Sequence, residues 1–328
     1  MCLCWALLLP ASALAQGAAP KAKFPGSALA IVSSEKDHAL AIVDLEQQAV
    51  VGTIATCKRP RHLHVMPGNA QVLAACGDSA QADLIDIAAR RSLRRFSLGD
   101  DPEIFDVSGD GRTLFVTNEE DGEVGIVDVG SGRRLGVIKV GEEPEGVLLS
   151  RDGRTLYVTS EVASLVHVID VASRKVVRDI QVGKRPRRLA LTPDGSELWV
   201  THELDASVGV IDTRRQALVA TIRFDIPGAR SSEITPVGLT MSADGRTAFV
   251  ALGRANHVAF VDVTERKTRS LVLVGKRAWG LATDRAGRRL YVVNGLSDDM
   301  TIVDIATAKP LKTIRVGRVP HSVVVIEP

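Results

Sequence analysis

The chain has 328 residues, of which 41 are Lys or Arg and 39 are Asp or Glu. This balance excludes the strongly basic field that would attract a nucleic-acid backbone or an anionic membrane surface, so we expect no nucleic-acid partner. Aromatic residues make up only 4% of the chain, whereas 45% is hydrophobic. A core of small aliphatic side chains suits many short β-strands.

The first residues have the pattern of an export signal. An apolar run from Leu3 to Leu9 is followed by the small residues Ala13-Leu14-Ala15, and this order is typical of a signal peptide cleaved after Ala15. We therefore expect a signal peptide over residues 1–15, an N-terminal extension over 16–26 and one folded domain over 27–328. Every other apolar run is shorter than the roughly 20 residues that cross a bilayer, so no membrane span is expected.

Two cysteines, Cys57 and Cys76, remain once the signal is removed. Disulfides persist in exported proteins, so a bridge between the two is the first hypothesis. Two separate, partly buried thiols are the alternative, because spacing alone does not establish the geometry of a bridge.

An internal repeat organises the rest of the chain. An aspartate ends an apolar segment seven times, at intervals of 42 residues with one interval of 50: Asp44, Asp86, Asp128, Asp170, Asp212, Asp262 and Asp304. A proline ladder follows the same spacing, with alanine at one rung: Pro60, Pro102, Pro144, Pro186, Pro236, Ala278 and Pro320. A single eight-residue insertion, within 225–235, accounts for both ladders.

Each repeat contains four short segments of strand type, which we call a, b, c and d. Asp-Gly pairs such as Asp152-Gly153 separate a from b and are typical of tight hairpin turns. The first repeat lacks an a strand, and the chain ends with a lone one, Ser322 to Ile326. These features predict an all-β, seven-bladed β-propeller of four-stranded antiparallel blades, closed by pairing the C-terminal strand with the N-terminal blade.

The d-to-a connections differ in charge, so we expect the face that carries them to be the working surface. The residue after each proline position is predicted to point towards the mouth of the central channel, giving the ring Arg61, Glu103, Glu145, Arg187, Val237, Trp279 and His321. An acidic arc facing a basic arc would hold an anionic ligand on the arginines, with Trp279 as a stacking surface. The alternative is a solvated rim of weak ion pairs.

The b-to-c loops add a second set of polar residues. Glutamates recur at one repeat position and are preceded by polar residues: Glu35, Glu119, Glu161, Glu203, Asn118, Ser160, His202 and Asn294. Clustered carboxylates would suit calcium, although a repeated polar residue more often caps a loop. His62 and His64 on a predicted a strand, with Cys76 or His321, are a weaker copper or haem hypothesis, and no Cys-x-x-Cys-His motif is present.

The repeats resemble the YVTN-repeat propellers, in Leu114-Phe115-Val116-Thr117-Asn118 and Leu156-Tyr157-Val158-Thr159-Ser160. They more closely resemble the propeller proteins associated with catabolism that depends on pyrroloquinoline quinone (PQQ), in Phe224-Asp225-Ile226-Pro227-Gly228 and Thr247-Ala248-Phe249-Val250-Ala251-Leu252-Gly253. The resemblance implies a periplasmic accessory protein of quinoprotein alcohol oxidation. It supplies no catalytic residues.

Three functions follow as hypotheses. The first is a non-catalytic module that binds a small anionic metabolite, PQQ or a periplasmic partner protein of the quinoprotein dehydrogenase system, with PQQ or calcium as possible cofactors. The second is a lactonase-type hydrolase, in which the loop glutamates and His202 act as base and acid. The third is non-covalent binding of a modified haem.

Overall fold

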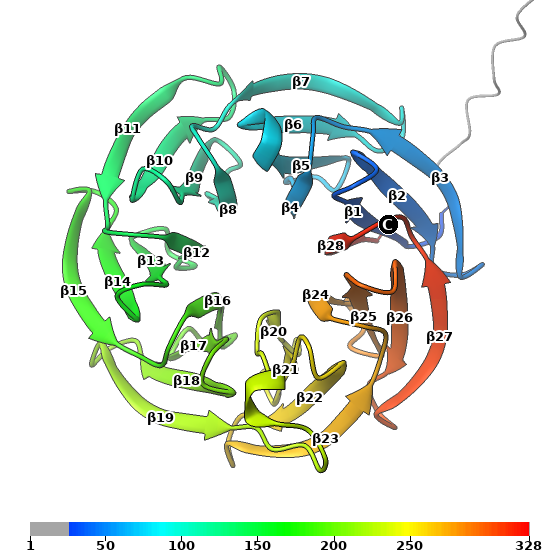
Figure 1. Ribbon diagram of the computed structural model, residues 1–328. Coiled ribbons are helices and arrows are strands. Elements are labelled where there is room, and N and C mark those ends of the chain that lie inside the picture. Colours follow the sequence, from blue (N-terminus) through cyan, green and yellow to red (C-terminus); the bar gives the residue numbers. More distant parts are fainter. Residues whose placement is uncertain (1–25, 328) are drawn as a thin grey trace, which may run out of the picture.

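The computed structural model describes residues 26–327, which form seven four-stranded antiparallel sheets arranged in a ring (Figure 1). The predicted signal peptide and nearly all of the predicted extension lie outside the described residues. Within 26–327, none of the helices is long and apolar enough to cross a membrane.

The blades follow one another around the ring in chain order. Blade 1 contains β28 (Pro320–Ile326), β1 (Leu29–Ser34), β2 (Ala39–Asp44) and β3 (Ala49–Ala55). Blade 2 contains β4 (Pro60–Val65), β5 (Gln71–Cys76), β6 (Gln81–Asp86) and β7 (Arg91–Ser97). Blade 3 contains β8 (Pro102–Val107), β9 (Thr113–Asn118), β10 (Glu123–Asp128) and β11 (Arg134–Lys139). Blade 4 contains β12 (Pro144–Leu149), β13 (Thr155–Ser160), β14 (Leu165–Asp170) and β15 (Lys175–Gln181).

The remaining three blades repeat this order. Blade 5 contains β16 (Pro186–Leu191), β17 (Glu197–His202), β18 (Ser207–Asp212) and β19 (Ala217–Arg223). Blade 6 contains β20 (Leu239–Met241), β21 (Thr247–Ala251), β22 (His257–Asp262) and β23 (Lys267–Leu273). Blade 7 contains β24 (Ala278–Thr283), β25 (Arg289–Asn294), β26 (Asp299–Asp304) and β27 (Lys309–Arg315). Two short 3₁₀ helices, η1 (Gly77–Ser79) and η2 (Ser231–Glu233), lie in connections.

Burial explains why the strands of one blade differ in sequence. The second and third strands are packed between neighbouring blades on both faces, so β9 is buried from Leu114 to Asn118 and reads as a continuous apolar run that ends in polar residues. The outermost strand β7 alternates between exposed and less exposed residues, since one of its faces meets solvent. The sequence pattern therefore follows the radial position of each strand.

The ring closes as predicted from the strand count. The C-terminal strand β28 pairs antiparallel with β1, with Leu29 opposite Ile326 and Val32 opposite Val323. Next to this pairing, the Nε atom of Arg318 donates to Asp37 Oδ1 at 2.6 Å, and the Arg318 backbone N–H donates to Asp37 Oδ2 at 2.7 Å. The two ends of the described chain are thus joined by main-chain and side-chain hydrogen bonds.

The repeated aspartates close the turns that follow the c strands. Asp44 Oδ1 accepts hydrogen bonds from the backbone N–H groups of Glu46 and Gln47, both at 2.9 Å. These side-chain bonds stabilise the turn that leads into β3. The equivalent aspartate accepts backbone N–H groups of the same turn in every blade, which explains the regular spacing of the aspartates.

The insertion lies in the connection between β19 and β20 and carries η2. The inner strand that follows it is shorter than those of the other blades, since β20 spans only Leu239–Met241. The backbone N–H of Val237 still donates to Ala251 O at 2.9 Å, so the preceding segment keeps its place beside β21. Blade 6 therefore contributes an apolar side chain, that of Val237, to the ring.

Candidate ligand site at the channel mouth

The d-to-a connections and b-to-c loops meet on one face of the propeller, which we call the mouth face. Glu119 N donates to Asp101 O at 3.3 Å, and Gly295 N donates to Arg277 O at 2.9 Å. Each of these bonds joins a b-to-c loop to the d-to-a connection of its own blade. This repeated backbone contact brings together polar residues that are far apart in the sequence.

Hydroxyl side chains of the second strands position the ring residues of the next blade. Thr117 Oγ1 donates to Glu145 O at 2.7 Å, and Thr159 Oγ1 donates to Arg187 O at 3.1 Å. Ser33 Oγ makes the same contact with Arg61 O at 2.8 Å. The hydroxyl that follows each buried apolar segment therefore has a structural role, since it holds the backbone from which a ring side chain extends.

All seven ring residues are at least nine-tenths buried, and their charges are paired rather than set in two opposed arcs. Arg61 forms an ion pair with Glu103 of the neighbouring blade. Arg187 pairs with Glu161, and its Nη1 lies 3.4 Å from Glu145 Oε2. Basic and acidic residues thus neutralise each other across blade boundaries, an arrangement that the sequence did not reveal.

Arg188 is a further residue of this network that sequence reasoning missed. Its Nη1 donates to Glu145 Oε1 at 2.7 Å, and Arg188 comes from the inner strand β16. Burial opposes ionisation of Glu145, but Arg187, Arg188 and Arg61 outweigh it and lower the pKa of Glu145 to about 2. Glu145 is therefore a buried carboxylate that is charged at neutral pH. In the sequence, the adjacent pair Arg187-Arg188 was the feature that could have indicated this network.

Trp279 and His321 form a hydrogen-bonded pair at the same mouth. Trp279 Nε1 donates to His321 Nε2 at 2.8 Å, and a tryptophan N–H can only donate. Burial, followed by the nearby Arg61 and Arg188, holds the pKa of His321 well below its usual value. His321 is consequently neutral near pH 7, with its ring proton on Nδ1.

These side chains line a pocket of 190 Å³ on the mouth face, whose walls include Arg59, Arg61, Arg187, Arg277, Trp279, His321 and Glu35. Three buried nitrogen atoms of its walls form no hydrogen bond among the described residues: Arg61 Nε, Arg187 Nε and His321 Nδ1. Of these, Arg61 Nε lies 3.5 Å from Glu35 Oε1 and Arg187 Nε lies 3.4 Å from Glu203 Oε2. The guanidinium of Arg277 stacks on Trp279 with its central carbon 4.5 Å from the ring centroid, and it forms no ion pair within 26–327. The pocket is therefore rich in N–H donors that form no hydrogen bond among the described residues.

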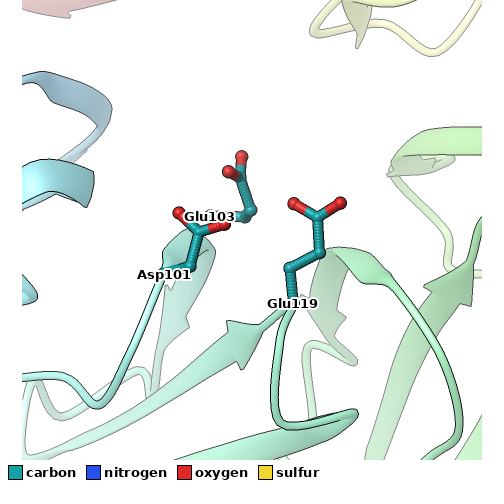
Figure 2. A group of neighbouring side chains, drawn as sticks. All are labelled: Asp101, Glu103 and Glu119. Atoms are coloured by element: carbon teal, nitrogen blue, oxygen red, sulfur yellow. The ribbon is translucent and has the colours of Figure 1, made fainter.

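The remaining carboxylates gather beside blades 3 and 4. Ligand atoms of Asp101, Glu103 and Glu119 lie within 4.8 Å of one another, as do those of Glu119, Glu143 and Glu161. Figure 2 shows the first three side chains: Asp101 directly precedes β8, Glu103 is the second residue of β8, and Glu119 follows β9. Of the four predicted loop glutamates, only Glu119 and Glu161 belong to these groups. Glu35 and Glu203 instead lie against arginines.

Other predicted site residues lie elsewhere. His202 is fully buried in blade 5, where its Nδ1 is 2.9 Å from Ser207 Oγ and its Nε2 accepts from Gly183 N at 3.2 Å. Asn294 is equally buried and donates to Asp299 Oδ1 at 2.7 Å. Neither residue lines the 190 Å³ pocket. Both tie a b strand to a neighbouring segment of the same blade.

Glu203 lies on the arginine side of the mouth face, with its Oε2 3.2 Å from Arg185 Nε and 3.4 Å from Arg187 Nε. Burial lowers the pKa of His202 to about 4, because it outweighs the opposing effect of Asp205, and the nearby Arg223 lowers the pKa further. His202 is uncharged at neutral pH and is engaged at both ring nitrogens. It is therefore poorly placed to act as a general acid beside Glu203.

Cys57 and Cys76 form a disulfide, as the first hypothesis predicted, with their Cα atoms 5.8 Å apart. The bridge links the connection before β4 to the end of β5. Because the two sulfurs are bonded to each other, Cys76 has no free thiolate with which to bind a metal alongside His62 and His64. These two histidines line a central cavity of 480 Å³, together with Asp106 and Arg188, and this cavity shares Trp279 and His321 with the 190 Å³ pocket.

Comparisons with protein families match parts of the repeat array. A model of the YNCE-like β-propeller matches residues 144–192, and a model of the seven-bladed β-propeller lactonases matches residues 173–326. The second match includes Arg187, Trp279 and His321 of the pocket. No curated protein shows significant similarity to the chain.

Solved structures share the fold. Hydrazine synthase of Kuenenia stuttgartiensis superposes with a TM-score of 0.76 at 21% identity, over 89% of this chain and 99% of that one. The periplasmic gluconolactonase PpgL of Pseudomonas aeruginosa gives a TM-score of 0.77 at 21% identity, over 91% and 99%. The dihydro-heme d1 dehydrogenase NirN, in complex with DHE, gives 0.68 at 16% identity, over 90% and 74%. At these identities the likeness establishes the propeller fold.

Proposed function

We propose that the chain is a binding module that holds a small carboxylate-bearing metabolite in the 190 Å³ pocket of the mouth face. The observation that carries the proposal is the set of three buried N–H donors that form no hydrogen bond among the described residues, on Arg61, Arg187 and His321. Leaving a buried donor unpaired costs about 1–3 kcal/mol. A carboxylate would accept from these donors and remove that cost.

Charge and shape support the same ligand class. Arg277 provides a guanidinium without an ion pair among the described residues, and it is stacked on Trp279. A planar guanidinium binds carboxylates with two parallel hydrogen bonds. The volume of 190 Å³ is below the roughly 300–1,000 Å³ of pockets for drug-sized ligands. The pocket therefore favours a compact metabolite, such as a sugar acid.

Location and partners belong to the same proposal. The disulfide supports an oxidising compartment, and the resemblance to propellers of PQQ-dependent catabolism suggests the periplasm and a quinoprotein dehydrogenase system. PQQ, which itself carries carboxylates, is therefore one ligand to test. Because it is larger than a sugar acid, it would extend beyond the pocket towards the channel.

Calorimetric titration of the exported chain with gluconate, and separately with PQQ, tests the proposal. We expect micromolar binding of at least one of them, weakened about tenfold in Arg277→Gln, which corresponds to about 1.4 kcal/mol. Arg151→Gln is the matched control, because Arg151 is an exposed arginine in the turn between β12 and β13 on the opposite face. Absence of binding, or equal losses in the two variants, would refute the proposed site.

Lactone hydrolysis is the second candidate, because the lactonase model matches 173–326, where seven of the ten pocket residues lie. Among the described pocket residues, Glu35 is the only carboxylate and would act as the general base that activates water. The unpaired donors would then stabilise the oxyanion of the tetrahedral intermediate.

A pH-stat assay with glucono-δ-lactone separates the two functions. A lactonase should turn over the lactone and lose turnover in Glu35→Gln, while the variant still binds gluconate. A pure binding module should bind gluconate and leave the rate of spontaneous hydrolysis unchanged.

A further inference from the structure

We infer that Asp101, Glu103 and Glu119 form a binding site for a divalent cation of the calcium class on the rim of the channel. This site is separate from the donor pocket and does not depend on the proposed function. It is built from Asp101 in the connection between β7 and β8, from Glu103 at the start of β8, and from Glu119 in the loop that follows β9 (Figure 2).

The spacing of the three carboxylates fits one ion. Their ligand atoms lie within 4.8 Å of one another. Calcium–oxygen distances are about 2.3–2.6 Å, so two oxygens bound to the same ion are separated by at most about 5 Å. The three side chains therefore reach a common point without a rearrangement of the backbone.

Glu103 provides the independent observation that a ligand is missing. Its side chain is 2% exposed, its Oε1 is paired with Arg61, and its Oε2 has no hydrogen-bond partner among the described residues. A buried carboxylate oxygen is expected to be hydrogen-bonded or bound to a metal, because the unpaired atom loses the stabilisation that water would provide. In this cluster, Glu103 lies beside the carboxylates of Asp101 and Glu119, which cannot donate a hydrogen bond to its Oε2 when they are ionised.

The local charge balance also calls for a cation here. Within residues 26–327, neither Asp101 nor Glu119 forms an ion pair with a lysine, arginine or histidine. The ligand atoms of the three carboxylates lie within 4.8 Å of one another, and a bound cation would balance these like charges.

The neighbouring cluster of Glu119, Glu143 and Glu161 is the poorer site. Glu161 pairs with Arg187, and its Oε2 lies 2.7 Å from Arg185 Nε. Two guanidinium groups already neutralise this carboxylate, so a cation would have to displace them. Glu143 is exposed and gains less from coordination.

The architecture favours calcium over magnesium. Two of the three carboxylates, those of Asp101 and Glu119, line a solvent-accessible depression of 690 Å³, while Glu103 is buried behind them. Calcium accepts 6–8 oxygen ligands in flexible geometry and would complete its shell with water, whereas magnesium demands near-ideal octahedral geometry. Ligands from two loops and the start of one strand suit the flexible coordination of calcium better than the strict octahedral coordination of magnesium.

Calorimetric titration of the disulfide-intact chain with CaCl₂ in 0.15 M NaCl, after treatment with EDTA, tests this inference. We expect one calcium per chain, an affinity at least tenfold weaker in Glu119→Gln and in Asp101→Asn, and weaker binding of magnesium. Glu143→Gln is the matched control and should retain calcium affinity within twofold, because Glu143 belongs only to the neighbouring cluster.

The inference is overturned if the unmodified chain binds no calcium, if Glu119→Gln binds it as tightly, or if Glu143→Gln loses as much affinity as Asp101→Asn. A rise in the unfolding temperature with calcium, seen in the unmodified chain and absent from Asp101→Asn, gives a second readout. Gluconate titration of the same calcium-free protein reports on the donor pocket, so failure of one site is distinguishable from failure of the other.

Discussion

Arg61 and Glu103, which are 42 positions apart in the chain and occupy the same place in neighbouring blades, form a buried ion pair at the channel mouth. Arg61 lines the donor pocket, while Glu103 belongs to the acidic cluster. The pair therefore joins the two candidate sites of the mouth face. Its energetics can be examined without any knowledge of the ligands.

Breaking the pair from one side should be strongly destabilising. Arg61→Met leaves Glu103 charged, buried and uncompensated, so we expect a loss of about 3–5 kcal/mol in the free energy of unfolding. Urea denaturation at pH 7 measures it. The double variant Arg61→Met with Glu103→Met should recover most of the loss, because it removes both charges. Equal instability of single and double variants would contradict this account.

The pH dependence of the free energy of unfolding should reveal the raised pKa of Glu119. Its pKa is about 7 in the folded protein, above the ordinary value of 4.5, so the folded state holds the proton more tightly. The resulting stabilisation is fully present below about pH 4.5 and is lost as the pH rises through 7.

Without calcium, Glu119→Gln should therefore match the unmodified chain at pH 4.5 and exceed its stability at pH 8.5 by about 1 kcal/mol, a value discounted because the side chain is partly exposed. Thermal unfolding at the two pH values measures the difference. Glu120→Gln, which alters the exposed neighbouring carboxylate, is the control. A gain in Glu119→Gln that is independent of pH would argue against a raised pKa.

Removal of the disulfide should lower stability without changing the fold. Cys57 and Cys76 enclose a loop with a sequence separation of 19, for which the chain-entropy model gives about 3 kcal/mol. The double variant Cys57→Ala with Cys76→Ala should show this loss in denaturant titrations while retaining the far-ultraviolet circular dichroism of the parent. Its stability should not respond to a reductant, whereas that of the unmodified chain should fall.

Closure of the ring should depend on the last strand. A chain that lacks residues 320–328 loses β28, which covers β1 and supplies His321 to the pocket. We expect this truncated chain to aggregate, because β1 becomes an unpaired edge. A synthetic peptide of residues 316–328, added during refolding, should restore soluble protein. A scrambled peptide of the same composition should not, and soluble, cooperative unfolding of the truncated chain alone would refute the argument.

The sequence by itself determined the architecture of this protein. A 42-residue spacing of aspartates and prolines, Asp-Gly turns and alternating apolar segments act locally in each blade, so they can be read without knowledge of long-range contacts. The strand count predicted the pairing of β28 with β1. The position of the ring residues at the mouth followed from the same repeat, because equivalent residues occupy equivalent places.

Only the tertiary structure decided which polar groups meet. The pairing of Arg61 with Glu103, the contact of Arg188 with Glu145 and the gathering of Asp101 with Glu119 depend on side-chain direction and on the approach of neighbouring blades. The repeat position of His202 resembled that of a functional loop residue, yet its side chain is buried within blade 5. Repetition specifies where a backbone lies, whereas the few ångströms that distinguish an ion pair from an unpaired donor are set by packing across the ring.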